Sequence, residues 1–302
     1  MSIQEITTSW FNPEGQRPWP PESLILQSLR ELDEPLIDMR FRPLGARTAE
    51  VICVKKYSEN HICIVRQRSP DPRMVCPLEE EYFVLQQMHS LCPTLVPEPI
   101  GVIRPNYSET FLVLRWVDGL RLGSRLQVSE SAEEIAEAIF PALSMFHTVG
   151  KRCDHFRLTR QIRVDRLFDD AERSPLRGNV VQSEIWDRTI SILREMTRGF
   201  DTPTLLHGDA HAYNLIETTD GSCWVDFELL AVGPPEIDNA RTWVLLQAQA
   251  QREVISPWQS EAQLAYDFLA ATNFLAAPSK EAWKQKGWQT VRSALIKIVS
   301  RL

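Results

Sequence analysis

The pattern of apolar positions changes its period along the chain. Residues 37–69 contain three short runs with alternating or β-branched apolar side chains, separated by turn residues, which predicts three antiparallel strands. Further predicted elements of this half are helices over 20–32 and 76–91 and strands over 99–105 and 109–117. The first 20 residues are rich in Pro, Trp and Gly, have no clear period and predict an irregular arm.

Beyond Gly119 the period becomes helical. Apolar stripes at 3.6-residue spacing predict five helices, over 130–149, 181–200, 239–251, 261–277 and 279–302. Strand-like pieces at 204–208 and 222–228 interrupt them. The order predicts an α+β chain of two lobes: a small sheet-rich lobe over 1–114 with the arm and first helix, a hinge at 115–119 and a larger helical lobe over 120–302. A cleft between two such lobes is a preferred place for a ligand.

Charge and composition narrow the class of partner. The 302 residues carry a formal net charge of −7, which argues against nucleic-acid binding and favours a cationic or neutral small molecule. No apolar run reaches the length of about 20 residues that crosses a bilayer, and the first residues do not resemble a secretory signal. The six cysteines form no CxxC pair, which predicts reduced thiols in a cytoplasmic protein.

The densest polar cluster within an apolar frame is LLHGDAHAYNLI, over 205–216. Asn214 follows Asp209 by five residues, and Asp226 comes after a turn-forming TTDGS, between two apolar residues of a strand-like run. Such a β-loop-β arrangement can bring two carboxylates and an amide oxygen around one point. Hard divalent cations prefer these oxygen ligands, so we expect Mg²⁺ on Asn214 and Asp226, with Asp209 left as a base or hydroxyl-orienting group.

An Asp with an Asn five residues later is also the layout of the kinase catalytic loop. His207–Asn214 together with Val225–Glu228 resembles the aminoglycoside phosphotransferase and choline kinase superfamily, relatives of the protein kinases, over about residues 37–245. The resemblance implies a two-lobed protein-kinase-like fold, with an antiparallel-sheet N-lobe and a mainly helical C-lobe. It also implies transfer of the γ-phosphate of ATP, or of GTP, to a hydroxyl of an aminoglycoside-like, choline-like or other small molecule.

The resemblance assigns further roles in the small lobe. It implies that Arg66 on the third strand orients the nucleotide phosphates and that Glu81 holds this arginine, with Lys55 as the rival cation. The adenine would contact the backbone around the hinge, at Leu114, Arg115, Trp116 and Val117. The phosphate-covering turn has Gly45 as its only glycine.

The histidines of the loop leave alternatives open. His207 is expected to brace the loop backbone, in agreement with the resemblance, whereas His211 is a candidate to face the transferred phosphate or to have a structural role. A zinc-dependent hydrolase with His207, Asp209 and His211 as ligands is the rival class. A second rival is a nucleotide-binding relative that has lost catalytic turnover, because the phosphate-covering turn has Gly45 as its only glycine and position 66 carries Arg instead of Lys.

Other polar residues of the second half receive weaker assignments. In the resemblance, Asp238 braces the catalytic loop, while His147 is read as a packed residue of an apolar helix. Glu253, Glu261 and Asp267 are candidates to face a cationic acceptor, and each is also typical of a solvated helix position.

Overall fold

The structure is a computed structural model. It describes residues 21–30, 32, 41–44, 49–54, 62–67, 75–106, 109–128, 132–154, 158–199, 203–255, 260–277 and 282–302. The predicted arm over 1–20, the turn at Gly45 and the side chain of Lys55 lie outside these residues.

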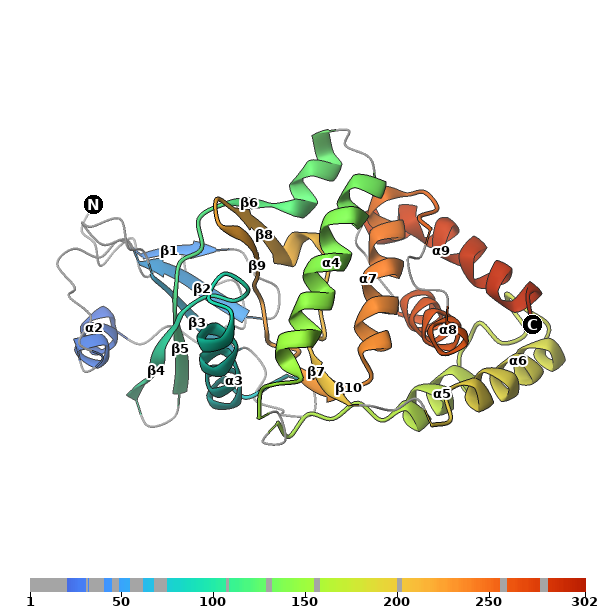
Figure 1. The fold of residues 1–302 in the computed structure, drawn as a ribbon, viewed down its shortest axis with the longest axis horizontal. Coiled ribbons are helices and arrows are strands. Elements are labelled where there is room, and N and C mark those ends of the chain that lie inside the picture. The colour runs from blue at the N-terminus through green and yellow to red at the C-terminus, as the bar shows by residue number, and fades with distance from the viewer. Residues whose placement is uncertain are drawn as a thin grey trace.

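The small lobe is built on one antiparallel sheet with the strand order β1-β2-β3-β5-β4 (Figure 1). Its strands are β1 (Phe41–Leu44), β2 (Ala49–Val54), β3 (Ile62–Gln67), β4 (Pro99–Asn106) and β5 (Glu109–Arg115). All five strands expected from the alternating pattern are present. The three N-terminal strands pair in sequence order, as short turn-bounded runs favour.

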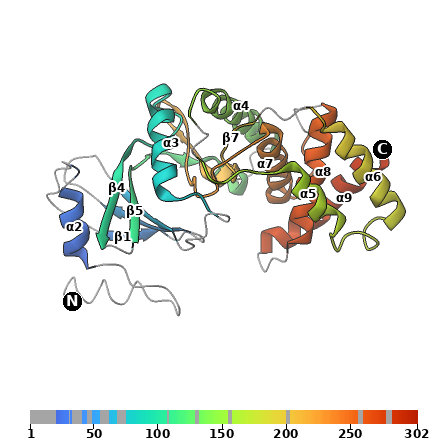
Figure 2. The same cartoon turned by 90° about the horizontal axis from the view of Figure 1, so that it is seen from below.

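Helices α2 (Glu22–Arg30) and α3 (Leu78–Leu91) lie on opposite faces of this sheet, as Figure 2 shows. Successive residues of a strand point to opposite faces. Accordingly, Phe111 and Val113 pack in a cluster with residues of α2, whereas Leu112 belongs to the larger core that includes residues of α3. The internal strand β5 is therefore buried on both faces.

The large lobe is mainly helical. Its helices are α4 (Ala132–Gly150), α5 (Val164–Glu172), α6 (Ser183–Met196), α7 (Pro235–Ala250), α8 (Glu261–Ala276) and α9 (Ala282–Ser300). Helix α7 lies between α4 and the pair α8 and α9 (Figure 1). The sequence pattern misses α5, because this nine-residue helix buries only Phe168 and Ala171 and has too few turns to show a clear stripe.

Short strands form two further small sheets. The strands β6 (Leu120–Arg121), β8 (Leu215–Thr218) and β9 (Gly221–Trp224) form one small sheet, and β7 (Thr204–Leu206) pairs with β10 (Ala231–Gly233). The hairpin of β8 and β9 confirms the turn expected at TTDGS. However, β9 ends at Trp224, so the prediction of a strand-like run through Asp226 is wrong.

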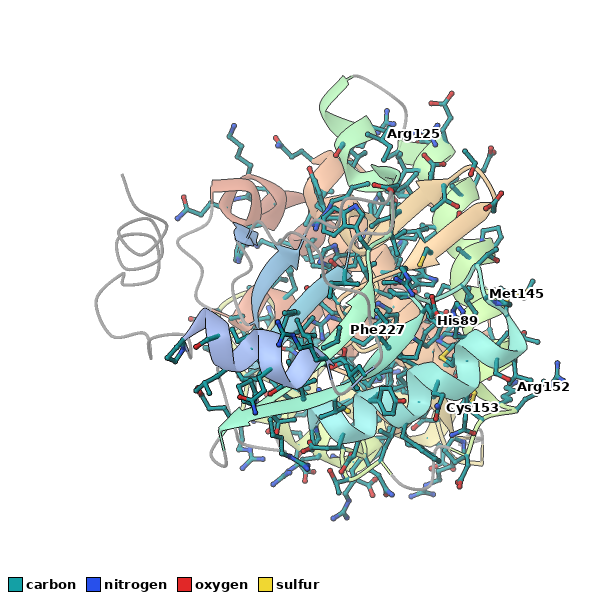
Figure 3. All side chains as sticks on the ribbon, turned by 90° about the vertical axis from the view of Figure 1, so that its left-hand side faces the viewer. His89, Arg125, Met145, Arg152, Cys153 and Phe227 are labelled. Atoms are coloured by element: carbon teal, nitrogen blue, oxygen red, sulfur yellow. The ribbon has the colours of Figure 1, made fainter. Side chains whose placement is uncertain are left out.

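The elements agree with a two-lobed α+β fold. The small lobe ends with β5 at Arg115, and an irregular segment leads to β6, which begins at Leu120. Phe227 is 1% exposed and lies in the interior when the molecule is viewed from the small lobe (Figure 3). No helix in the described part of the chain combines the length and the apolar character needed to cross a membrane.

Candidate functional site

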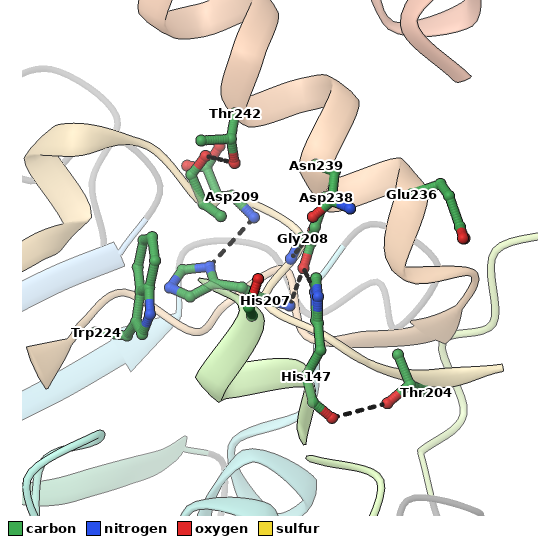
Figure 4. Close-up of polar contacts among 12 residues, drawn as sticks. His147, Thr204, His207, Gly208, Asp209, Trp224, Glu236, Asp238, Asn239 and Thr242 are labelled. Atoms are coloured by element: carbon green, nitrogen blue, oxygen red, sulfur yellow. Dashed lines mark hydrogen bonds and ion pairs between the residues drawn. The ribbon is translucent and has the colours of Figure 1, made fainter. Parts of the chain in front are cut away.

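Asp238 fixes the start of the loop that follows β7. Its carboxylate, fully buried in the first turn of α7, accepts hydrogen bonds from the backbone N–H of His207 (2.7 Å) and of Gly208 (2.9 Å), as Figure 4 shows. Nε2 of His147 lies 3.1 Å from the same carboxylate. Burial alone would raise the pKa of Asp238, but these donors and the nearby histidines lower it. The predicted brace is present, and His147 is a polar partner of it instead of a residue that only packs.

Gly208 makes the turn of this loop possible. Its φ is +79°, a left-handed conformation that glycine adopts without steric cost. A Cβ at this position would also overlap the carbonyl oxygen of Leu229. The loop therefore passes against the segment after β9 at a distance that only glycine permits.

His207 binds backbone groups on both sides of its ring. Nδ1 accepts from the N–H of Asp209 at 3.3 Å, so Nε2 carries the proton and donates to the carbonyl oxygen of Val225 at 3.1 Å. Burial lowers the pKa of His207 to about 4, which keeps the ring neutral. The bracing role expected for His207 agrees with this geometry.

The same contacts make the zinc-site hypothesis wrong. A ligand needs a free ring nitrogen lone pair, and the one on His207 accepts from the backbone. The residues that the structure describes also contain no group of three or more His, Cys, Asp or Glu side chains placed to hold a metal ion. His207, Asp209 and His211 therefore do not form the expected set.

Asp209 lies at the open end of the loop and is flanked by different partners at its two oxygens. Oδ1 is 2.7 Å from Nη2 of Arg241, whereas Oδ2 is 3.6 Å from Nε2 of His211 and 3.5 Å from Nδ2 of Asn214. Burial alone would raise the pKa of Asp209, but His211 and the charge of Arg241 bring it well below its usual range. Asp209 is thus an ionised carboxylate at neutral pH.

Asn214 and the segment before Asp226 are joined directly. Nδ2 of Asn214 donates to the carbonyl oxygen of Asp209 at 3.0 Å, and the carbonyl oxygen of Asn214 accepts from the N–H of Val225 at 2.9 Å. Because the amide nitrogen of Asn214 is engaged with the loop, Oδ1 is the atom of this side chain left for a cation. The spacing of the two motifs thus brings Asn214 next to the residue that precedes Asp226.

Asp226 has a backbone conformation that is rare for a side chain other than glycine, with φ of +69°. The surrounding protein raises the pKa of Asp226, and the negative charge of Asp209 raises it further. A divalent cation would reverse both effects, since it favours the ionised form. The oxygens of Asn214 and Asp226 therefore fit Mg²⁺, which prefers a few oxygen ligands of this type.

Glu81 on α3 is buried and faces the same segment. Burial raises the pKa of Glu81 well above its usual value, and the charges of Asp226 and Glu228 raise it further. Arg66, its expected partner, lies in β3 opposite Phe111, and its side chain is outside the described part. Because cross-strand partners share a face of a sheet, the register places position 66 on the α2 side with Phe111. This register is at odds with the predicted pairing of Arg66 with Glu81, because α3 lies on the other face of the sheet.

The residues expected around the adenine are contiguous in the structure. Leu114 is buried near the end of β5, and Nε of Arg115 donates to Oε2 of Glu98 at 3.0 Å. Trp116 and Val117 are half-buried in the irregular segment that follows, between the lobes. Their assignment to the nucleotide stays a prediction.

Two arginines near Asp209 were not found from the sequence. Arg241 is three residues after Asp238 on α7, so the two share a helix face, and this spacing was the available signal. Arg160 comes from the segment before α5 and donates to the carbonyl oxygen of Leu229, far away in the sequence. No local pattern indicated it.

The acidic candidates for the acceptor lie elsewhere. Glu253 forms an ion pair with Lys297, and Glu261 is exposed at the start of α8. Asp267 is buried between α7 and α8, where Nε2 of Gln263 donates to it at 2.8 Å. In the described part of the chain, the contacts of Glu253 and Asp267 are with residues of α9 and α8 and not with the loop.

The fold and the braced loop define a phosphotransferase of the protein-kinase-like class. The phosphotransferase enzyme family, APH, matches residues 63–272, and the chain belongs to this family. The recognition made from the two motifs is confirmed. No curated protein matches the sequence.

Solved structures of low sequence identity have the same fold. They include the GDP and kanamycin complex of APH(2")-IIIa, at 13% identity, covering 92% of this chain and 98% of that chain with a TM-score of 0.58. A thermostable mutant of APH(4)-Ia in a ternary complex with AMP-PNP and hygromycin B has 11% identity, coverage of 92% and 97%, and a TM-score of 0.59. A choline/ethanolamine kinase family protein from Mesorhizobium loti has 11% identity, covers 86% of this chain and 91% of that chain, and has a TM-score of 0.56.

Proposed function

We propose that this protein transfers the γ-phosphate of ATP to a hydroxyl of a small molecule, with Asp209 as the residue that receives the acceptor hydroxyl. The observation that supports this most directly is the arrangement around Asp209. Its carboxylate is ionised and 21% exposed, Asp238 braces the backbone of the two residues before it, and the side-chain amide of Asn214 lies against it. Phosphoryl transfer requires mainly such positioning of groups and neutralisation of charge.

The low pKa of Asp209 defines its part in the reaction. A weakly basic carboxylate orients the hydroxyl well and removes its proton only as the bond to phosphorus forms, which suits a loose transition state. The acceptor oxygen bonds to the γ-phosphorus, the bond from this phosphorus to the bridging oxygen breaks, and ADP leaves. The hydroxyl proton passes to Asp209 and then to water.

The other groups bind and orient the nucleotide. Asn214 and Asp226 would hold Mg²⁺, which neutralises phosphate charge when bound. The backbone of 114–117 would contact the adenine, and Arg66, or Lys55 as the alternative, would contact the phosphates. His211, whose Nδ1 accepts from the N–H of Tyr213 at 3.2 Å, directs Nε2 toward Asp209 and the transferred group. The boundaries 1–114, 115–119 and 120–302 are proposed for the two lobes and their hinge.

Replacing Asp209 by Asn tests the assignment. Asp209→Asn keeps the shape of the side chain and removes its charge, so we expect phosphate transfer to fall by about 10²–10⁴-fold while nucleotide binding persists. Transfer is measured as ADP release with a panel of hydroxyl acceptors. Binding is measured as the shift in melting temperature with ATP, GTP or ADP, with and without Mg²⁺.

Asp220→Asn, at the exposed tip of the β8–β9 hairpin, is the matched control and should keep both activities. Equal turnover by Asp209→Asn would contradict the role of this carboxylate. A melting temperature that no nucleotide changes would contradict the kinase function as a whole. A nucleotide-dependent shift with no transfer to any acceptor would instead support a relative that has lost turnover.

A further inference from the structure

Arg241 places a cation on one particular side of Asp209. Its Nη2 contacts Oδ1, whereas the metal-ligand candidate Asn214 and the ring of His211 lie at Oδ2. The carboxylate therefore separates the guanidinium of Arg241 from the groups proposed to hold Mg²⁺. The side chain of Arg241 is 41% exposed, so its guanidinium, which carries five N–H donors, can be reached by an incoming molecule.

A second guanidinium lies close to the first. Arg160 donates to the carbonyl oxygen of Leu229, the same oxygen that lies against Gly208 at the turn of the loop. Burial lowers the pKa of Arg160, and the positive charge of Arg241 lowers it further. Two cations that repel each other beside the loop favour the arrival of an anion.

The carboxylates nearby, Asp238 and Asp209, attract Arg160 but are already engaged with other partners. Asp238 already accepts from two backbone N–H groups and lies in contact with His147. Asp209 pairs with Arg241 but must also receive the acceptor hydroxyl. The guanidinium fork of arginine matches the two oxygens of a carboxylate or phosphate in a way that no neutral group does.

We propose that Arg241, supported by Arg160, selects an acceptor that carries an oxyanion, a carboxylate or a phosphate ester, close to the hydroxyl that is phosphorylated. This inference rests on the proposed kinase function and names the chemical class of its acceptor. It replaces the expectation of a cationic or neutral partner, because the charges beside Asp209 act on the acceptor at short range, whereas the net charge of −7 is spread over the whole chain. Ammonium groups next to the hydroxyl would meet two guanidinium groups.

Acceptors that share a hydroxyl and differ in the neighbouring charge test the proposal. Suitable sets are glycerate with glycerol and serinol, and glucose 6-phosphate with glucose and glucosamine; kanamycin serves as a polycationic acceptor. Transfer is measured as ADP release, and binding by calorimetry in the presence of Mg²⁺ and AMP-PNP. We expect kcat/KM at least tenfold higher for the anionic member of a set, and the two sets distinguish carboxylates from phosphate esters.

Variants of Arg241 connect this preference to the residue. Arg241→Gln should raise KM for anionic acceptors at least tenfold and change KM for neutral acceptors little, and Arg241→Lys should restore part of the loss. Arg252→Gln is the matched control, since Arg252 is also half-exposed and pairs at 2.7 Å with a carboxylate, that of Glu133, but lies away from the loop. The melting-temperature shift with Mg²⁺ and nucleotide verifies that each variant is folded.

A preference for cationic or neutral acceptors would overturn the inference and leave the kinase function intact. An equal decrease of kcat for all acceptors in Arg241→Gln, with KM unchanged, would also overturn the inference and leave the kinase function intact, because Arg241 would then only position Asp209. If no acceptor is phosphorylated, oxyanion binding that does not depend on Arg241 overturns it. Loss of the nucleotide-dependent shift in the wild-type protein would instead refute the proposed function itself.

Discussion

The two sides of helix α7 differ in whether their buried polar side chains have hydrogen-bond partners. Toward the loop, Asp238 accepts from two backbone N–H groups, and Thr242 donates to the carbonyl oxygen of Ala210 at 2.8 Å. Away from the loop, Asn239, which contacts Gln263 of α8, and Gln247 are buried, and Oδ1 of Asn239 and both amide atoms of Gln247 have no hydrogen-bond partner among the residues that the structure describes.

Two buried aspartates show what this difference means. Asp238 and Asp267 are both almost inaccessible to solvent, yet the pKa of Asp238 is lowered and burial raises that of Asp267 to about 7. Asp238 faces several N–H donors and two histidines, whereas Asp267 receives, among the described residues, one hydrogen bond, from Gln263. Burial alone therefore does not decide the charge of a carboxylate; the number of donors aimed at it does.

Removing the carboxylate on the loop side should have the largest effect on stability. Asp238→Ala leaves two buried N–H groups without an acceptor, and we expect the free energy of unfolding to fall by about 3–5 kcal/mol. Urea denaturation followed by circular dichroism measures this change. A loss below about 1 kcal/mol would show that the loop is held by other contacts.

The carboxylate on the α8 side should behave in the opposite way. The folded pKa of Asp267, about 7, lies above its ordinary value of 3.8, so the folded state binds the extra proton between these pH values and stability falls as pH rises through this window. Asp267→Asn cannot ionise. It should increase the free energy of unfolding at pH 8 by on the order of 1–4 kcal/mol and by less at pH 5. Denaturation at the two pH values checks this, and an equal change at both would contradict the raised pKa.

The smallest expected effect concerns the amide of Gln247. Gln247→Met replaces a fully buried group without a described partner by an apolar side chain of similar size. We expect a stability equal to that of the wild type or higher by about 1 kcal/mol, because no hydrogen bond is lost. Thermal unfolding measures it, and a loss of more than about 1 kcal/mol would indicate that the amide has a partner.

The strands and long helices were predictable because their signals repeat locally. Alternation in 37–69 and in 109–117 gave the sheet, and stripes of apolar residues gave all the long helices. The apolar pattern does not predict helix α5, because this helix is short. It also does not predict the conformation of Asp226, because the apolar neighbours Val225 and Phe227 resemble the pattern of a strand. The left-handed conformation of Asp226 comes directly after the contact of Val225 with Asn214, a residue of the preceding loop, and a local pattern does not contain such a contact.

The sequence by itself determined the family and the spacing of Asp209, Asn214 and Asp226, because a catalytic loop is a local feature whose residues follow one another along the chain. Only the tertiary structure decided which charges surround Asp209. Arg241 lies 32 residues further along the chain, and Arg160 belongs to the segment before α5. Electrostatic interactions depend on distance in space, so the packing of α7 and the loops sets the ionisation of Asp209 and the charge that an acceptor meets.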